Sequence, residues 1–533
     1  MPCPDRPGER CDLSVERSRR SQSSSQIPRR EWLAGAVSVA AMAGCRSQDS
    51  PAGSAASRRR TDVPLRVVWV GSEEDADVLK RSWASISEQP LDVRIVAPPR
   101  PLPGVSGETE SPAELNVSGE LFEKAATSDV LIYPVAMLSQ LVSKKRIMPL
   151  LDQASGTQAT GQTGTDSAGD LETSETVFAS EDRTTMPVGL RIATTFSSER
   201  LAIPVGGYLP ALLLGEEAHS TKEAHSAKEA DSAKEADGAK AAASAKEAAI
   251  TDWESYGEFV KSSDGKCCEP TAPTWAGAMY LWRLSSSLTA TWLFERETLH
   301  PLLTEREYVA ILEQMQNAVQ TSVDANQGRT PGEIYNAVAS GELLGGIGFP
   351  QRGLPTDEDS SVGGLITLAS LPTGSSSRRA EQSRLGLRVD PSRGMVDPFM
   401  LVGSMAASCR QTAAADTFLQ WLAGGEGSEP LYRNIGEFID TKTAPSESSN
   451  DLFEQYRNWL SKKLSDANFV PTLQLIGAAE YYDALDKGVR ECVHENKPAR
   501  QACEEISERW SRLHRKFDLP AQQRNWRRAQ GIS

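Results

Sequence analysis

The side chains that most often carry out catalysis or bind metals are present, but their spacing frames no reactive set. The chain has five histidines without the spacing of a metal site, and eight cysteines without a CxxC pair. We therefore expect no zinc site, no other metal and no cofactor. A glycoside hydrolase would need two positioned carboxylates. The 72 Asp and Glu residues leave such a pair open, but no motif frames one, so we expect no catalytic residues and no enzyme activity.

Four of the cysteines form two pairs that lie close together in the sequence. Cys492 and Cys503 flank the segment VHENKPARQA on the facing arms of a predicted helix hairpin. A disulfide between them is one interpretation, since an exported compartment would permit it, and two buried free thiols is the other. Cys267 and Cys268 are adjacent in a predicted loop, and the sequence gives them no mechanism.

The segment RREWLAGAVSVAAMAGC, residues 29–45, combines two arginines, a short apolar run and a cysteine. The apolar run is shorter than the ~20 residues that a membrane-spanning helix needs. A basic flank, a short apolar region and small residues at the end are typical of an export signal. The arginine pair resembles a twin-arginine signal, and the last four residues resemble a lipobox with Cys45 as the acylated residue. A buried helix after a basic tail is the alternative.

The sequence therefore predicts an export signal at residues 1–44 and a tether at 45–62, which is rich in Ser, Ala, Gly and Arg. We expect an exported protein, periplasmic or at the cell surface, that is anchored to a membrane by lipid on Cys45. The net charge of −15 argues against nucleic acid as a partner and against a peripheral basic membrane patch. The remaining chain is too long for one ordinary core, so two lobes are expected.

The elements that would position functional side chains alternate between strands and helices. The run LRVVWVG at residues 65–71 is typical of a buried strand, a helical spacing follows at 73–86, and LDVRIV at 91–96 is the next strand. This order predicts a parallel sheet in an α/β fold. Further along, the sequence predicts a helix and strand at 121–134, then a helix and the exit from it at 136–152, and two short strands at 200–214. It also predicts helices at 251–260, 275–288 and 305–319, a helix and strand at 330–350, a strand at 399–408, a helix at 412–424 and a C-terminal helix hairpin.

Two segments interrupt this pattern. Residues 153–183 are rich in Ser, Thr, Gly and acidic residues, which predicts a disordered insertion. Residues 219–248 contain five hexads of the type HSAKEA. A six-residue period rotates the pattern around a helix, so no continuous apolar stripe forms, and we expect a solvated helix or a spacer without a catalytic role.

A resemblance to a known protein family depends on four stretches of the chain and on their order, at residues 65–86, 128–152, 330–350 and 477–510. The second contains DVLIYP and later IMPLLD, the third contains AVASGELLGGIGFP, and the fourth begins GAAEYYDAL. Their order and spacing resemble those of the extracellular solute-binding proteins of family 1, the maltose-binding-like receptors of ABC importers. The chain departs from the family at Gly215-Glu216, where a Tyr-Asn pair is common.

The resemblance implies an α/β fold of the two-lobed periplasmic-binding-protein type II class, with hinge strands and C-terminal helices. It assigns residues 63–203 and 404–450 to lobe 1, 204–403 and 451–518 to lobe 2, and 519–533 to a tail. It also implies a monomer that captures a small solute, most simply a carbohydrate, by lobe closure and delivers it to ABC permease subunits. The positions that match the family's ligand-binding motifs are Ser72, Glu73, Tyr133, Tyr208, Trp275, Phe349, Gln351 and Tyr481.

Some aromatic and acidic residues also have an explanation that does not involve ligand. Glu73 could simply begin a helix, where its charge favours the helix dipole. Trp69, Trp282 and Trp292 are expected to pack in the core rather than to contact ligand. Three rival functions stay open: an exported carbohydrate-active enzyme, a binding module for a sensor kinase, and a receptor of the same fold for iron or a polyamine.

Overall fold

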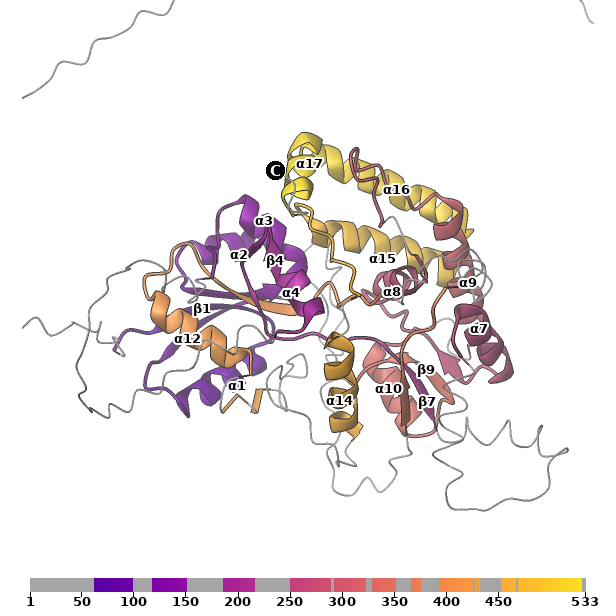
Figure 1. Ribbon diagram of the computed structural model, residues 1–533, viewed down its shortest axis with the longest axis horizontal. Helices are drawn as coiled ribbons and strands as arrows, with labels where there is room; N and C mark the ends of the chain where they lie inside the picture. The colour runs from indigo at the N-terminus through magenta and orange to yellow at the C-terminus, as the bar shows by residue number, and fades with distance from the viewer. Residues whose placement is uncertain are drawn as a thin grey trace, which may run out of the picture. The chain divides into compact units, whose positions relative to one another are not determined.

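The computed structural model describes residues 62–98, 117–150, 186–215, 250–288, 292–322, 328–350, 366–374, 393–424, 427–428, 430–431, 452–465 and 468–529 (Figure 1). The chain divides into two units, residues 1–58 and 59–533, and all described residues lie in the second. The expected export signal, the insertion at 153–183 and the hexad repeat lie outside the described residues. The same is true of Cys45 and Gln351.

The first sheet has the strand order β2-β1-β3-β11-β6 in the described residues. Its strands are β1 (Leu65–Val70), β2 (Leu91–Val96), β3 (Val130–Pro134), β6 (Ile203–Pro204) and β11 (Leu401–Met405). β2 and β3 run parallel to β1, as the sequence predicts, while β11 runs antiparallel to β3 and β6. A strand from late in the chain is therefore inserted into a sheet that the first part of the chain begins.

The second sheet has the order β10-β7-β9-β8. Its strands are β7 (Ala211–Gly215), β8 (Cys267–Cys268), β9 (Gly345–Gly348) and β10 (Ile366–Ala369). β7 pairs antiparallel with both β9 and β10, and β8 pairs parallel with β9. A two-stranded hairpin of β4 (Thr195–Phe196) and β5 (Glu199–Arg200) stands apart from both sheets.

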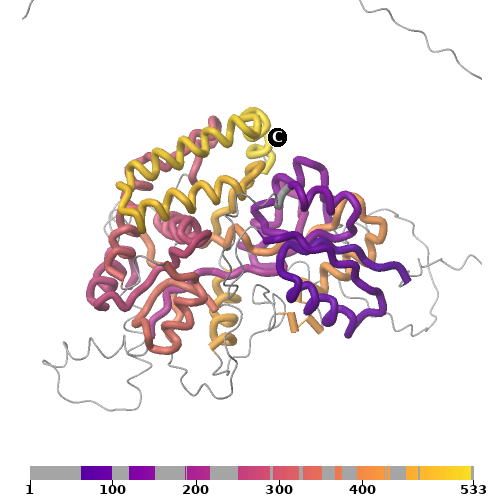
Figure 2. The backbone as a smooth tube through the Cα atoms, turned by 180° about the vertical axis from the view of Figure 1, so that it is seen from behind, coloured from indigo at the N-terminus to yellow at the C-terminus, as the bar shows by residue number. Residues whose placement is uncertain are grey.

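Helices separate and cover these strands. Around the first sheet lie α1 (Glu73–Ala84), α2 (Val117–Ala125), the short η1 (Val135–Met137), α3 (Leu138–Ser143), α4 (Val188–Thr194) and α12 (Thr412–Leu422). Beyond them follow α7 (Trp253–Ser262), α8 (Ala276–Ser287), α9 (Arg306–Thr321), α10 (Pro331–Ala339), α14 (Leu452–Ser465), α15 (Ala478–Glu495), α16 (Ala499–Lys516) and α17 (Leu519–Ala529). Figure 2 shows α15 and α16 side by side, as the predicted helix hairpin.

The burial of β1 explains its uninterrupted apolar sequence. Leu65, Val67 and Trp69 point to one face and pack in a core with α1 and α12, whereas Val68 and Val70 join the core on the other face. Because successive side chains of a strand alternate between faces, a strand covered on both sides is apolar at nearly every position. Trp69 is fully buried, as the sequence predicts.

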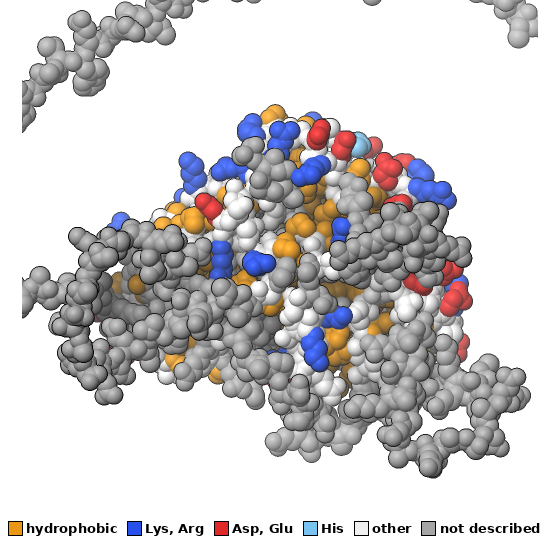
Figure 3. All heavy atoms as spheres, viewed as in Figure 1, with side chains coloured by type: hydrophobic (Ala, Val, Ile, Leu, Met, Phe, Trp, Pro, Cys, Tyr) orange, Lys and Arg blue, Asp and Glu red, His pale blue; other side chains and the backbone are white. Residues whose placement is uncertain are grey.

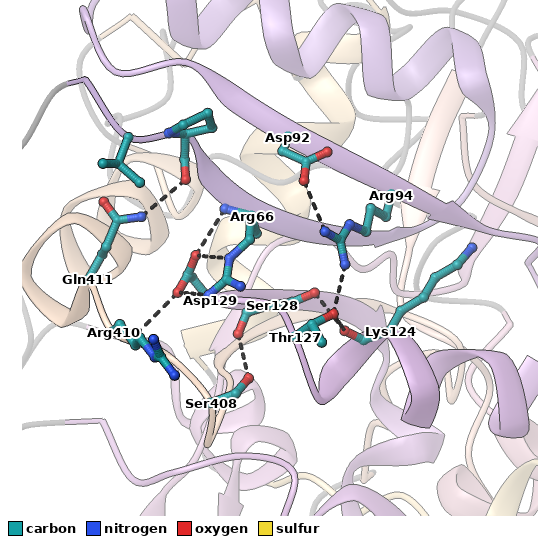
Figure 4. A network of polar contacts seen from close by, with 12 residues as sticks. Arg66, Asp92, Arg94, Lys124, Thr127, Ser128, Asp129, Ser408, Arg410 and Gln411 are labelled. Carbon is teal, nitrogen blue, oxygen red and sulfur yellow. Dashed lines mark hydrogen bonds and ion pairs between the residues drawn. The ribbon is translucent and has the colours of Figure 1, made fainter.

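Asp129, directly before β3, links three segments at the edge of the first sheet (Figure 4). Its carboxylate accepts hydrogen bonds from the backbone N–H and Nε of Arg66, at 3.1 and 3.0 Å, and from the backbone N–H of Arg410 at 3.2 Å. Burial alone would raise the pKa of Asp129, but the hydrogen bonds from Arg66 and Arg410 together hold it below its ordinary value. The segment after β11 is thus tied to the start of β1.

The helix predicted within residues 136–152 is α3, which ends at Ser143. The chain then turns at Lys145, which has a φ of 52°, and Ile147 forms a bridge with Ala406, just after β11. The residues after α3 are therefore the exit from the helix. Within the segment 519–533, which the sequence assigns to a tail, residues 519–529 form α17 and Trp526 is buried.

Candidate ligand-binding site

Three of the sequence-predicted residues form one aromatic cluster. The ring of Tyr208 stacks on that of Phe349, with centroids 4.8 Å apart and planes within 9°. Trp275 meets Phe349 edge to face at 5.5 Å. We name Tyr208, Trp275 and Phe349 the aromatic cluster. Tyr208, Trp275 and Phe349 are 7%, 6% and 1% exposed, so all three residues are buried.

The pairing of β7 with β9 brings Tyr208 and Phe349 together. Ala211 at the start of β7 pairs with Gly348 at the end of β9, and the two strands are antiparallel. Residues just before β7 and just after β9 therefore emerge at the same edge of the second sheet. The sequence places both residues beside predicted strands, but it does not show that these strands are partners.

Tyr208 lies on the segment that connects the two sheets, between β6 and β7. The backbone N–H groups of Val205 and Gly206 donate to Leu401 O, at 3.0 and 3.1 Å. The Tyr456 hydroxyl from α14 accepts from Leu209 N at 3.1 Å and donates to Leu209 O at 2.7 Å. This segment is therefore fixed from both sides, next to Tyr208. Sequence reasoning missed Tyr456, and 247 residues separate it from its partner, so no local signal marks it.

Trp275 is fixed by a carboxylate from another helix. It stands at the N-cap of α8, as expected, and its own side chain does not cap the helix. Asp486 on α15 instead accepts hydrogen bonds from Thr274 N and Gly277 N, each at 2.9 Å. These donors flank Trp275 and belong to the helix start, where N–H groups lack partners within the helix. Asp486 therefore sets the position of Trp275, and no local sequence pattern marks this carboxylate as the cap of α8.

Trp282 lies beneath the aromatic cluster. It is fully buried, with its ring 6.3 Å from Trp275 and 6.2 Å from Phe349. Its indole N–H has no hydrogen-bond partner within the part of the chain that the structure describes. Its packing role is the one that the sequence predicts.

The remaining predicted residues lie elsewhere. Ser72 caps α1 by accepting from Asp75 N at 3.1 Å, and Glu73 is an exposed residue in the first turn of that helix. Tyr133 is buried in β3, with its hydroxyl 2.7 Å from Ser404 Oγ, and burial raises its pKa above the ordinary value. Tyr481 packs against Trp510 and His514. The structure does not bring these four residues to the aromatic cluster.

The aromatic cluster offers ring surfaces of the kind that bind small ring-shaped ligands. Aromatic faces pack against the apolar faces of small rings, and a few polar groups at their edges provide orientation. Two buried carboxylates that contact α8 already have partners: Asp486 accepts from backbone N–H groups, and Glu269 forms a buried ion pair with Arg283. Within the described residues, no group of three or more His, Cys, Asp and Glu side chains is placed to hold a metal ion.

The cysteines do not form the disulfide that the sequence allows. Cys492 and Cys503 are free and buried on α15 and α16, so the alternative of two buried thiols holds. The Cys503 thiol lies within hydrogen-bonding reach of the Tyr280 hydroxyl, which donates to Tyr308 O at 3.0 Å. Burial raises the pKa of both thiols to about 12, which disfavours the reactive thiolate. Cys267 and Cys268 are also free and buried, on β8 rather than in a loop.

Comparison with known proteins yields no match to a family model or to a curated protein, but solved structures share the fold. Maltose-bound MalE3 of T. maritima is 14% identical, with a TM-score of 0.54 over 85% of this chain and 100% of that one. An ABC transporter solute-binding protein from Agrobacterium radiobacter K84, in complex with ribitol, is 12% identical, with a TM-score of 0.54 over 85% and 98%. An ABC substrate-binding protein from Listeria monocytogenes, in complex with cycloalternan, is 9% identical, with the same TM-score and coverage.

These likenesses confirm the expected fold class, the two-lobed α/β fold of periplasmic binding proteins. They also confirm that the resemblance in the sequence reflects the fold of sugar-binding ABC solute-binding proteins. Among the described residues, no helix combines the length and apolarity needed to cross a bilayer.

Proposed function

We propose that this chain is an extracytoplasmic receptor that captures a small carbohydrate and delivers it to an ABC importer. The observation that carries the proposal is the aromatic cluster at the segment joining two sheets of this fold. The solved proteins with this fold are named in complex with maltose, ribitol and cycloalternan. A chain that shares their fold and holds aromatic rings beside a connecting segment suits the same class of ligand.

The proposed mechanism needs no bond to break. A sugar ring would lie against Trp275 or Tyr208, while backbone and amide groups satisfy its hydroxyls. Hinge closure is the known motion of periplasmic binding proteins. Ligand would favour the closed state because it contacts both lobes at once, which the open state does not allow. The permease would then bind the closed form.

The location is part of the proposal and rests on the sequence of residues 29–45. An export signal followed by an acylated Cys45 would hold the receptor at the outer surface of a membrane. Cell fractionation tests this point. Wild type is expected with the membranes and Cys45→Ser in the soluble exported fraction, and a Cys45→Ser protein that stays with the membranes contradicts the anchor.

A thermal-shift series on the full chain tests the ligand class. Maltose, maltotetraose and ribitol are compared with spermidine and ferric citrate. A ligand that binds only the native state at 100 times its Kd stabilises it by about 2.7 kcal/mol, which raises the Tm by a few degrees. We expect a shift with at least one sugar, and loss of that shift in Trp275→Leu.

Trp421→Leu is the matched control. Trp421 is 4% exposed and packs against Trp83 and Phe418 in the core of the first sheet, so the variant loses a comparable buried ring away from the aromatic cluster. It should unfold earlier than wild type but keep the sugar shift. A shift only with spermidine or ferric citrate would keep a receptor and reject the sugar. Release of new reducing ends from maltotetraose would identify a hydrolase instead.

A further inference from the structure

The outward face of α17 consists of arginines. The helix buries Gln522, Asn525 and Trp526, and it exposes Arg524, Arg527 and Arg528. Residues three and four apart lie on the same side of a helix, so these three arginines form one face, opposite the buried one. The spacing is what places three cations together at the surface.

Side-chain hydrogen bonds hold α17 in a fixed position. The Gln522 side chain accepts from Ile476 N at 2.9 Å and donates to Ile476 O at 2.7 Å. Asn525 Nδ2 donates to Gln474 O at 2.9 Å, and Trp526 is buried beside them. The three arginines therefore lie on a helix that is packed against the rest of the fold.

Neighbouring helices extend this charge. α17 packs against α3, where Lys144 and Lys145 are exposed at the C-terminal end, and against α16, where Arg515 is exposed in the last turn. Figure 3 shows Lys and Arg side chains gathered over α17. We define the basic face as Lys144, Lys145, Arg515, Arg524, Arg527 and Arg528.

None of these six cations forms an ion pair within the part of the chain that the structure describes, in contrast to the adjacent Lys516, which pairs with Glu480 at 2.5 Å. Exposed carboxylates on the surrounding elements include Asp518 at the turn before α17, Glu199 on the hairpin that α17 contacts, and Glu297, whose backbone carbonyl accepts from Gln523 at 3.4 Å. Glu504 and Glu508 are exposed on α16. Like charges spaced three or four residues apart on a helix repel each other. An anionic partner would reduce this repulsion.

We propose that the basic face contacts the anionic headgroups of a lipid bilayer and so orients the folded body on the membrane. A bilayer presents many phosphates over a wide area, which matches exposed cations that lie on α17 and at the C-terminal ends of α3 and α16. The rest of the molecule is strongly acidic, since the whole chain carries −15, and would be repelled by the same surface. The attraction would decay within a Debye length of about 8 Å, so the basic face would have to approach the headgroups closely.

The lipid anchor of the proposed function would strengthen this contact without being required for it. The overall charge argues against a basic membrane patch. The fold nevertheless groups basic side chains, because α3, which is far from α17 in the sequence, and α16 both pack against α17.

Vesicle flotation of the full chain tests the proposal. A Cys45→Ser background prevents acylation, so that every variant carries the same unacylated N-terminal segment. Vesicles of phosphatidylglycerol and phosphatidylcholine in equal parts are compared with pure phosphatidylcholine. Because each basic residue near an anionic surface contributes about 1 kcal/mol, we expect Arg524→Glu/Arg527→Glu/Arg528→Glu to weaken binding to the anionic vesicles at least about tenfold. High salt should weaken wild-type binding in the same way.

The control reverses three other exposed cations. Lys266→Glu/Arg306→Glu/Lys462→Glu changes the net charge equally on other elements and should bind the anionic vesicles at least tenfold more tightly than the arginine variant. Equal losses in both variants, or no loss in either, would overturn the proposal. If soluble polyglutamate bound the face and the vesicles did not, the partner would be an acidic macromolecule, which also overturns it. Lys144→Glu/Lys145→Glu repeats the test on α3, should α17 not tolerate three substitutions.

Discussion

His514, near the end of α16, is enclosed by aromatic rings. Its ring centroid lies 5.4 Å from those of Phe294 and Tyr481, and its Nδ1 is 2.9 Å from the Tyr481 hydroxyl. It is 5% exposed, and this burial lowers its pKa to about 4. Gln522 Nε2 donates to the Tyr481 hydroxyl, which leaves that hydroxyl proton free to donate to the neutral imidazole ring. The site therefore favours the uncharged histidine.

Acidification should destabilise the protein through His514. An unfolded histidine has a pKa of about 6.5, so between about pH 6.5 and 4 the unfolded state binds a proton that the folded state does not. Stability then falls as the pH falls through this window, by on the order of 2 kcal/mol. Urea unfolding at about pH 7 and about pH 4.5 measures the loss. His514→Gln should show a smaller loss than wild type, whereas His300→Gln, at an exposed position, should match wild type. An unchanged loss in His514→Gln would exclude this histidine as the cause.

At the scale of elements, α8 and α15 meet closely. A Cβ at Gly277 would lie 2.9 Å from the Asp486 backbone, so the glycine permits the contact. The same approach brings the Asp486 carboxylate to the first N–H groups of α8. One side chain thus serves as the N-terminal cap of a helix that begins with a tryptophan, a residue that cannot accept these bonds itself.

Removal of that carboxylate should be costly. Asp486→Ala leaves two N–H groups without an acceptor in a buried place, and we expect a loss of about 3 kcal/mol of unfolding free energy. Asp486→Asn keeps the shape but offers one oxygen, so an intermediate loss of about 1–2 kcal/mol is expected. Asp483→Ala is the control on the same helix, since burial raises the pKa of Asp483 and its charge contributes no stability there. Denaturant unfolding compares the three, and similar losses at positions 483 and 486 would contradict a capping role.

Elements with a strong local pattern were predictable, and long-range partners were not. Three predictions that depend only on the pattern of neighbouring residues were confirmed: the strand β1, the start of α10 at Thr330–Pro331, and the helix hairpin of α15 and α16. For the candidate site, the sequence pointed to Tyr208, Trp275 and Phe349, because each lies next to a predicted strand or helix. Asp486 and Tyr456 act on residues more than 200 positions away, and neither spacing nor residue type marks such a pair.

At the scale of the whole molecule, two connecting segments lie against each other. One runs from β6 to β7 and contains Gly207, and the other leads into β11 and contains Met400. Gly207 has a φ of 136°, and a Cβ there would lie 3.0 Å from Met400 Sδ and 3.2 Å from Met400 Cβ. The segment joining the two sheets therefore depends on a glycine both for its backbone conformation and for its contact with the second segment.

Substitution of Gly207 should separate these two contributions. We expect Gly207→Ala to lower the unfolding free energy by about 2–3 kcal/mol, part from the backbone conformation and part from crowding against Met400. Gly341→Ala is a reference for a positive φ without crowding, with an expected loss of about 1 kcal/mol, because Gly341 has a φ of 77° and open space around its Cβ position. Met400→Ala makes room for the added methyl group, so the double variant Gly207→Ala/Met400→Ala should lose about 1 kcal/mol less than the sum of its single variants. Denaturant unfolding of wild type, the two single variants at Gly207 and Met400 and the double variant forms a double-mutant cycle, and Gly341→Ala is measured alongside it. Strict additivity would show that the two segments do not transmit strain to each other, and the connection between the sheets would then be looser than their contact indicates.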